Sequence, residues 1–168
     1  MAPSDLPIIT PVDSTVYATV QLSSSEQVEE AVQRAAKAQK EWKKVPIKGR
    51  VEMGRKFLAA VGAREAELAK ELTMQMGRPI RYTPGEIKGT QDRGKYMVDV
   101  AEEALKDVEI EDPALAGKFK RFIRKEAVGV VLIVAPWNYP YLSSLNGVLP
   151  SILAGNSVIL KHSSQTPL

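Results

Sequence analysis

Polar side chains follow two apolar runs near the carboxyl end of the chain. The first run ends in Ala135-Pro-Trp-Asn-Tyr-Pro140, and the second ends at Lys161. The carboxamide of Asn138 offers two N–H donors, which suit an oxygen that gains negative charge. Lys161 offers a point charge and donors for ribose hydroxyls or phosphate, and Trp137 offers a flat apolar wall. The alternative is that Asn138 only satisfies loop backbone groups and that Lys161 is only solvated.

A single βαβ unit, Val128–Lys161, has to position these side chains. Val128–Ala135 is β-branched and apolar on both faces, which is typical of a central parallel strand covered by helices on each side. Leu142–Ala154 predicts a helix, Gly155-Asn156 a turn, and Ser157–Leu160 a second buried strand. The crossover is long enough for a parallel, right-handed connection. Because ligands bind at the carboxyl ends of such strands, we expect both polar groups at one edge of a sheet.

The preceding residues predict a scaffold of one strand and three helices. Thr15–Leu22 alternates between apolar and polar residues like a strand, and Ser23 with Glu26 predicts a capping box at the start of the first helix. Gly77 stands where a C-cap glycine would end the second helix. The helices are expected over residues 23 to about 44, about 48 to 76, and 84 or 86 to 105.

Residues 108–125 differ from both neighbours. Alternating strands flank a Pro113–Gly117 turn, which predicts a long polar hairpin. Its alternating charges suit an exposed ribbon or a subunit contact, and both interpretations stay open. The basic residues of this segment alternate with Phe and Ile, which favours a solvated strand face over a nucleic-acid surface; they are Lys118, Lys120, Arg121, Arg124 and Lys125.

Composition limits the class of protein. The chain has 168 residues, a net charge of +3, 44% apolar and 26% charged residues, which is ordinary for one soluble globular domain. It has no cysteine and a single histidine, His162, so we expect no disulfide, no cysteine nucleophile and no metal site. The amino terminus lacks the features of a signal peptide, and the longest apolar run, 127–137, is shorter than the ~20 residues of a membrane span. These features predict a cytoplasmic protein.

Four segments together resemble the first half of the NAD(P)-dependent aldehyde dehydrogenase superfamily. They are Glu126-Ala-Val-Gly-Val-Val, Ala135-Pro-Trp-Asn-Tyr-Pro140, Leu153-Ala-Gly-Asn-Ser-Val-Ile-Leu-Lys161 and Gln165-Thr-Pro167. Neither a GxGxxG nor a GxxxxGK[ST] motif is present. The resemblance covers the whole chain. It implies an α/β fold with an N-terminal helical layer, the first βαβ of a doubly wound parallel sheet and a β-hairpin excursion, in an incomplete domain. The expected divisions are 1–107, 108–125 and 126–168.

The resemblance also implies roles for individual residues. Asn138 matches the family's asparagine that donates its side-chain amide to the oxyanion of the thiohemiacetal. Lys161 matches the lysine that binds the adenosine ribose of NAD or NADP. Ala135, Pro136 and Trp137 match residues that line the cofactor cleft. The 108–125 hairpin matches part of an oligomerisation element, which implies a homo-oligomer for a full-length protein.

Three departures from the family pattern change what is expected. Ala127 replaces a usual proline, which is a minor change. Ser164 stands where the family has a glutamate that accepts bonds from the ribose hydroxyls and would repel a 2′-phosphate, so we expect NADP to be accepted. His162 is expected to be structural or at the surface. The catalytic cysteine, the general-base glutamate and a Gly-Ser turn lie downstream in the family and are absent, so we expect this chain alone to be inactive.

The preferred interpretation is the N-terminal part of an NAD(P)-dependent aldehyde dehydrogenase, which oxidises an aldehyde to a carboxylic acid. The alternatives are a non-catalytic truncated paralogue that acts as an interaction module, and a gene-model fragment.

Overall fold

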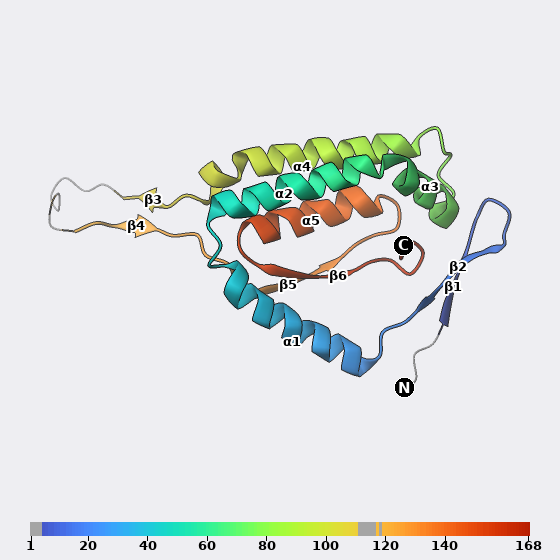
Figure 1. Ribbon diagram of the computed structural model, residues 1–168, viewed down its shortest axis with the longest axis horizontal. Coiled ribbons are helices and arrows are strands. Elements are labelled where there is room, and N and C mark those ends of the chain that lie inside the picture. Colours follow the sequence, from blue (N-terminus) through green and yellow to red (C-terminus); the bar gives the residue numbers. More distant parts are fainter. Residues whose placement is uncertain (1–4, 111–116, 118) are drawn as a thin grey trace.

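The computed structural model describes residues 5–110, 117 and 119–168 as a mixed α/β arrangement (Figure 1). The helices are α1 (Ser25–Trp42), α2 (Ile47–Ala63), α3 (Glu65–Met76), α4 (Thr83–Leu105) and α5 (Pro140–Leu153). The strands are β1 (Asp5–Ile9), β2 (Val16–Gln21), β3 (Val108–Glu109), β4 (Phe122–Ile123), β5 (Val130–Val134) and β6 (Ser157–Lys161).

The predicted βαβ unit is confirmed. Strands β5 and β6 pair in parallel, in a register that runs from Val130 opposite Ser157 to Val134 opposite Lys161. The turn between α5 and β6 is fixed by the buried side chain of Asn156. Its Oδ1 accepts a hydrogen bond from the backbone N–H of Gly129 at 2.9 Å, and its Nδ2 donates to the carbonyl of Ser151 at 3.1 Å. One carboxamide therefore ties the start of β5 to the end of α5.

The helices form layers on both sides of this strand pair (Figure 1). Helix α5 lies on one face, with α2 and α4 packed beyond it, while α1 contacts the other face. Buried apolar side chains from α2, α4 and α5 make the core between the helices; they are Val51, Leu58, Val98, Ala101, Leu145, Leu149 and Leu153. This core holds α5, and therefore the start of the loop before it, against the rest of the helical layer.

The prediction that the first strand is covered on both faces is wrong for the chain as described. Ile133 packs against α5, where a Cβ built on Gly147 would lie 2.7 Å from its Cδ1. On the opposite face, Leu132 and Val134 remain 64% and 65% exposed. The cause is that α1 contacts mainly β6 and leaves most of that face of β5 open.

Helix boundaries differ from the sequence predictions in two places. The capping box is formed by Ser24 and Gln27, one residue later than expected, because the first helix begins at Ser25. The predicted second helix divides into α2 and α3 at Arg64, whose φ of −107° and ψ of 14° depart from helical values. The αL glycine at Gly77, with φ of 77°, ends α3 as predicted.

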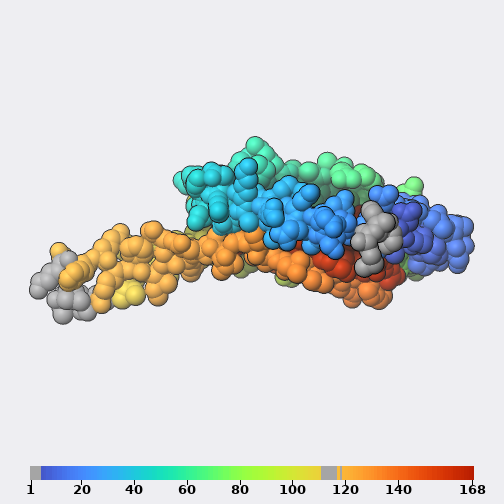
Figure 2. All heavy atoms as spheres, turned by 90° about the horizontal axis from the view of Figure 1, so that it is seen from below, coloured from blue at the N-terminus to red at the C-terminus, as the bar shows by residue number. Residues whose placement is uncertain are grey.

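Two strand pairs lie outside the central unit. Strands β1 and β2 form an antiparallel hairpin, which contacts α3 through a 2.8 Å hydrogen bond from the Tyr17 hydroxyl to Glu71. The sequence did not predict β1. Strands β3 and β4 also pair antiparallel, as predicted, and form a ribbon that projects from the body (Figure 2). Most of the predicted Pro113–Gly117 turn lies outside the described residues. Among the residues that are described, no helix has both the length and the apolar character to cross a membrane.

The close packing of α2 against α4 leads to a prediction about the stability of variants at two glycines of α4. A Cβ on Gly94 would lie 2.4 Å from a methyl carbon of the buried Leu58, whereas a Cβ on Gly89 would meet nothing within 4 Å. Replacing glycine by alanine within a helix stabilises the fold by about 0.5–1 kcal/mol. At Gly94 this gain is opposed by overpacking against Leu58, which costs about 1–3 kcal/mol. We expect Gly94→Ala to lower the free energy of unfolding and Gly89→Ala to raise it, measured by urea denaturation. Equal effects would contradict this account of the α2–α4 contact.

Candidate functional site

The carboxyl ends of β5 and β6 bring most of the predicted site residues to one edge. The backbone N–H of Ala135 donates to the carbonyl of Lys161 at 3.0 Å, so the loop after β5 begins beside the end of β6. Ala135 is buried, whereas Pro136, Trp137 and Asn138 are exposed. The strand pairing therefore places the loop that carries Trp137 and Asn138 beside the end of β6, where Lys161 lies.

Lys161 and Ser164 present unengaged polar groups. Within the described residues, neither the Lys161 ammonium nor the Ser164 hydroxyl has a hydrogen-bond partner or an ion pair. Ser164 lies in a turn that two hydrogen bonds to Ser163 hold in place. The carbonyl of Ser163 accepts from the N–H of Thr166 at 3.2 Å, and the hydroxyl of Ser163 accepts from the N–H of Gln165 at 3.2 Å. An ordered turn thus holds Ser164, which follows shortly after Lys161 in the chain.

This edge fits a nucleotide cofactor in its chemistry. A free ammonium and a free hydroxyl are suitable donors for ribose or phosphate oxygens. The half-exposed ring of Trp137, on the loop after β5, supplies an apolar surface. The carboxamide of Asn138 also lacks a partner among the described residues, so the explanation that it only satisfies the loop backbone has no support in the structure.

The sequence did not reveal the group that accepts hydrogen bonds from the first turn of α5. The carboxylate of Glu86, on α4, accepts from the backbone N–H groups of Tyr141 at 3.1 Å and Leu142 at 3.5 Å through Oε1. Its Oε2 accepts from Arg78 at 2.7 Å, and the Glu86 side chain is fully buried. One signal was available in the sequence: Tyr139, which precedes Pro140 at the helix start, is not a residue type whose side chain caps a helix, and the structure shows no side-chain cap bond there.

The electrostatics of Glu86 are set by two opposing effects. Burial raises the pKa of Glu86 above its usual value, while the N–H groups of Leu142 and Tyr141 and the Arg78 guanidinium favour the charged form. The folded chain therefore keeps this proton at a pH at which an unfolded chain has lost it. The contribution of Glu86 to the free energy of unfolding therefore falls as the pH rises through that window.

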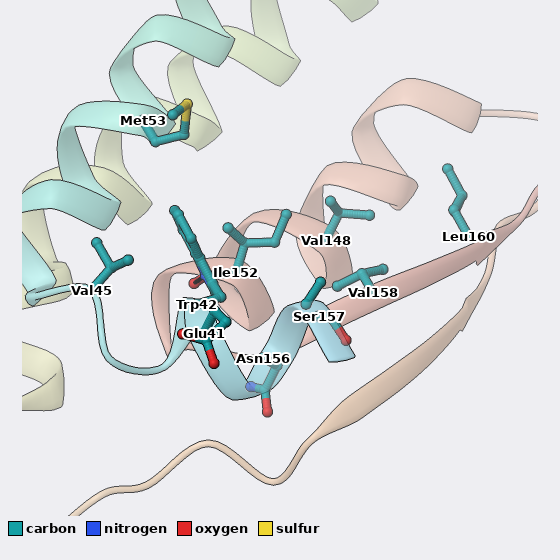
Figure 3. A pocket seen from close by; sticks show the side chains of 11 residues that line it. Glu41, Trp42, Val45, Met53, Val148, Ile152, Asn156, Ser157, Val158 and Leu160 are labelled. Atoms are coloured by element: carbon teal, nitrogen blue, oxygen red, sulfur yellow. Dashed lines mark hydrogen bonds between the residues drawn. The ribbon is translucent and has the colours of Figure 1, made fainter. Parts of the chain in front are cut away.

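Among the described residues, two hollows along β6 are lined by neither Lys161 nor Ser164. The first, of about 720 Å³, is mostly apolar and runs from the start of β6 past Trp42 and Met53 (Figure 3). The second, of about 540 Å³, lies toward the carboxyl end of β6 and is lined by Tyr141 and Thr166 among others. Lys161 and Ser164 thus lie outside the lining of both hollows, although His162 and Thr166 line the second one.

Comparisons with known proteins agree with this architecture. The model of the aldehyde dehydrogenase family matches residues 2–168. The 3,6-anhydro-alpha-L-galactose dehydrogenase of Streptomyces coelicolor is 31% identical over 163 residues, which are 97% of this chain and 32% of that protein. The chain thus spans about a third of the length of the curated relatives it matches.

Two solved structures illustrate the structural similarity. A succinic semialdehyde dehydrogenase from Streptococcus pyogenes, in complex with NADP⁺, has a TM-score of 0.87 at 25% identity, and the match covers 96% of this chain and 35% of that one. A betaine aldehyde dehydrogenase from Staphylococcus aureus, in complex with NAD⁺, has a TM-score of 0.90 at 26% identity, with 98% and 33% covered.

The buried hydroxyl of Tyr141 leads to a prediction about stability. It has no hydrogen-bond partner among the described residues, and burial raises the pKa of Tyr141 to about 12. An unsatisfied buried hydroxyl costs about 1–3 kcal/mol. We expect Tyr141→Phe to raise the free energy of unfolding by about 1 kcal/mol, and to remove the tyrosinate absorbance change near pH 12.

The matched control is Tyr17→Phe, which removes a hydroxyl that donates to Glu71. This variant should lose about 0.5–1.5 kcal/mol. A loss of stability in Tyr141→Phe instead would mean that the Tyr141 hydroxyl has a bonding partner.

Proposed function

Since the chain belongs to the aldehyde dehydrogenase family, we propose that it supplies the amino-terminal part of an NAD(P)-dependent enzyme that oxidises an aldehyde to a carboxylic acid. The observation that supports this most directly is the Ala135–Lys161 backbone bond, which sets the loop of Asn138 beside the cation at one strand edge. In open α/β sheets this is the edge at which ligands bind.

Asn138 has the role of oxyanion donor in this proposal. A cysteine thiolate that attacks an aldehyde converts the carbonyl oxygen to an oxyanion, and a fixed N–H donor lowers the energy of that charge. The exposed carboxamide of Asn138, free of bonds within the described residues, can donate an N–H to such an oxygen. The chain has no cysteine, so the thiolate has to come from outside these 168 residues.

The cofactor would lie across the ends of β5 and β6. Lys161 would bind the adenosine ribose, while Ala135, Pro136 and Trp137 would form the wall of the cleft. Ser164 adds a neutral hydroxyl donor there, which leaves room for a 2′-phosphate and favours acceptance of NADP as well as NAD. When bound, the nicotinamide accepts the hydride that leaves the aldehyde carbon.

The β3–β4 ribbon is proposed as a subunit contact of a homo-oligomer. Phe122 and Ile123 on β4 are exposed at 40% and 56%, and the ribbon projects away from the core. A cytoplasmic location and the divisions 1–107, 108–125 and 126–168 stay predictions. The competing interpretation of an interaction module without catalysis predicts that no polypeptide containing this chain oxidises an aldehyde. A gene-model fragment instead predicts that an in-frame continuation supplies the missing cysteine and restores the enzyme.

The activity test uses the longest polypeptide that the coding sequence yields when it is read past Leu168. If that polypeptide supplies a cysteine, it should form NADH or NADPH from an aldehyde, and the 168-residue chain alone should not. Asn138→Ala should lower kcat by about 10²–10³, the cost of losing one oxyanion donor. Gln33→Ala, which removes an exposed carboxamide on α1, should leave kcat unchanged. A stop codon after Leu168 would favour the interaction module.

Cofactor choice is tested separately at Ser164. A carboxylate within about 4 Å of a 2′-phosphate at a protein surface costs about 1–4 kcal/mol. Ser164→Glu should therefore lower kcat/KM for NADP about tenfold or more and leave the value for NAD equal or higher. Gln165→Glu adds the same charge at the next exposed position and should change the ratio far less. A wild-type enzyme that rejects NADP would overturn the role given to Ser164.

A further inference from the structure

Helix α5 begins directly after the loop that carries Asn138, and its first turn lacks local hydrogen-bond partners. Pro140 has no N–H, and the N–H of Ser143 already bonds the carbonyl of Tyr139 at 2.9 Å. The unpaired donors of the turn are therefore the N–H groups of Tyr141 and Leu142. Both point to one oxygen of Glu86, which comes from α4, 55 residues earlier than Tyr141.

Arg78 connects the same carboxylate to the residue that follows Asn138. Its guanidinium donates to the second oxygen of Glu86 at 2.7 Å, and the guanidinium carbon lies 4.2 Å from the centroid of the Tyr139 ring. Glu86 thus holds the backbone just after Tyr139, while Arg78 holds its side chain. Two linked charges fix one end of the loop.

The other end of the loop is fixed by the bond from Ala135 to Lys161. Between these two anchors, the side chain of Asn138 has no partner among the described residues. The direction of its carboxamide therefore depends on where Ala135 and Tyr139 are held. A displacement of Tyr139 would pass directly to Asn138, its neighbour in the chain.

We propose that Glu86 and Arg78 are positioning residues for Asn138, and that they act by clamping Tyr139 and the first turn of α5. The Glu86 side chain is fully buried, and within the described part of the chain its hydrogen bonds are made to Arg78, Tyr141 and Leu142, so it does not reach a substrate as a base. The negative charge at the helix start complements the macrodipole, and Arg78 balances that charge in the buried site.

The clamp is separable from the stability of α5 as a whole. Leu145, Leu149 and Leu153 of α5 belong to the helical core and lie beyond the capped turn. Loss of the clamp should therefore loosen the first turn and the loop while the remainder of α5 stays packed. A purely structural role would instead weaken the whole helix together.

The first experiment uses the 168-residue chain and does not depend on the proposed function. Glu86→Gln keeps the shape of the side chain and removes its charge. Amide hydrogen exchange at Tyr141 and Leu142 should accelerate about tenfold or more, exchange at Leu149 and Leu153 should not change, and the side-chain amide resonances of Asn138 should shift. Asp99→Asn, which breaks the exposed ion pair between Asp99 of α4 and Arg55 of α2, is the matched control and should change none of them.

A second pair of variants covers the case in which Glu86→Gln does not fold. Tyr139→Phe retains an aromatic face for Arg78 and should leave the Asn138 resonances in place, whereas Tyr139→Leu should shift them. Unchanged exchange in a folded Glu86→Gln variant, or identical Asn138 resonances in the two Tyr139 variants, would overturn the proposal.

The second experiment measures catalysis and rests on the proposed function. In the active polypeptide, Glu86→Gln should lower kcat by about 10²-fold, because a displacement of roughly 1 Å in a reacting group costs that much. KM for the cofactor should stay the same, and Asp99→Asn should keep full activity. The two failures are distinguishable: an inactive wild type refutes the proposed function alone, whereas normal kcat in Glu86→Gln refutes the clamp.

Discussion

The buried carboxamide of Asn156 is the constraint on which the candidate site depends. It bonds the backbone at Gly129, where β5 begins, and at Ser151, in the last turn of α5. The carbonyl of Gly129 in turn accepts from Ser157, the first residue of β6. These bonds set the parallel register. A slip of one residue would turn every side chain of a strand to the other face and separate Ala135 from Lys161.

Beyond the strands, the geometry of the site comes from elements that are distant in the sequence. The start of α5 is bound by a carboxylate of α4, and the same carboxylate is paired with an arginine that follows α3. Helices α2, α4 and α5 share one apolar core, so the spacing between Glu86 and the first turn of α5 is set by side-chain packing far from the strand ends. Apolar packing between the helices thus helps to hold the polar groups in place.

Much of this arrangement could be predicted from the sequence because it rests on local patterns. The β-branched run before Pro136 and the Gly155-Asn156 turn predicted both strands and their parallel order, and Gly77 predicted the end of α3. The division of the second helix at Arg64 could not be predicted, since apolar residues recur with helical spacing on both sides of it. The open face of β5 was also missed, because a strand's composition does not say which helices cover it.

The cap that α4 provides for α5 has a consequence for the order of folding. The contact joins residues that are 55 positions apart, so the chain has to close a long loop before the first turn of α5 gains its partner. Contacts of this kind form after local helices, which require no such loop closure. The Asn138 loop is therefore expected to take its final shape among the last steps, once α4 is docked, so that a partly folded chain would have its helices but not an assembled site.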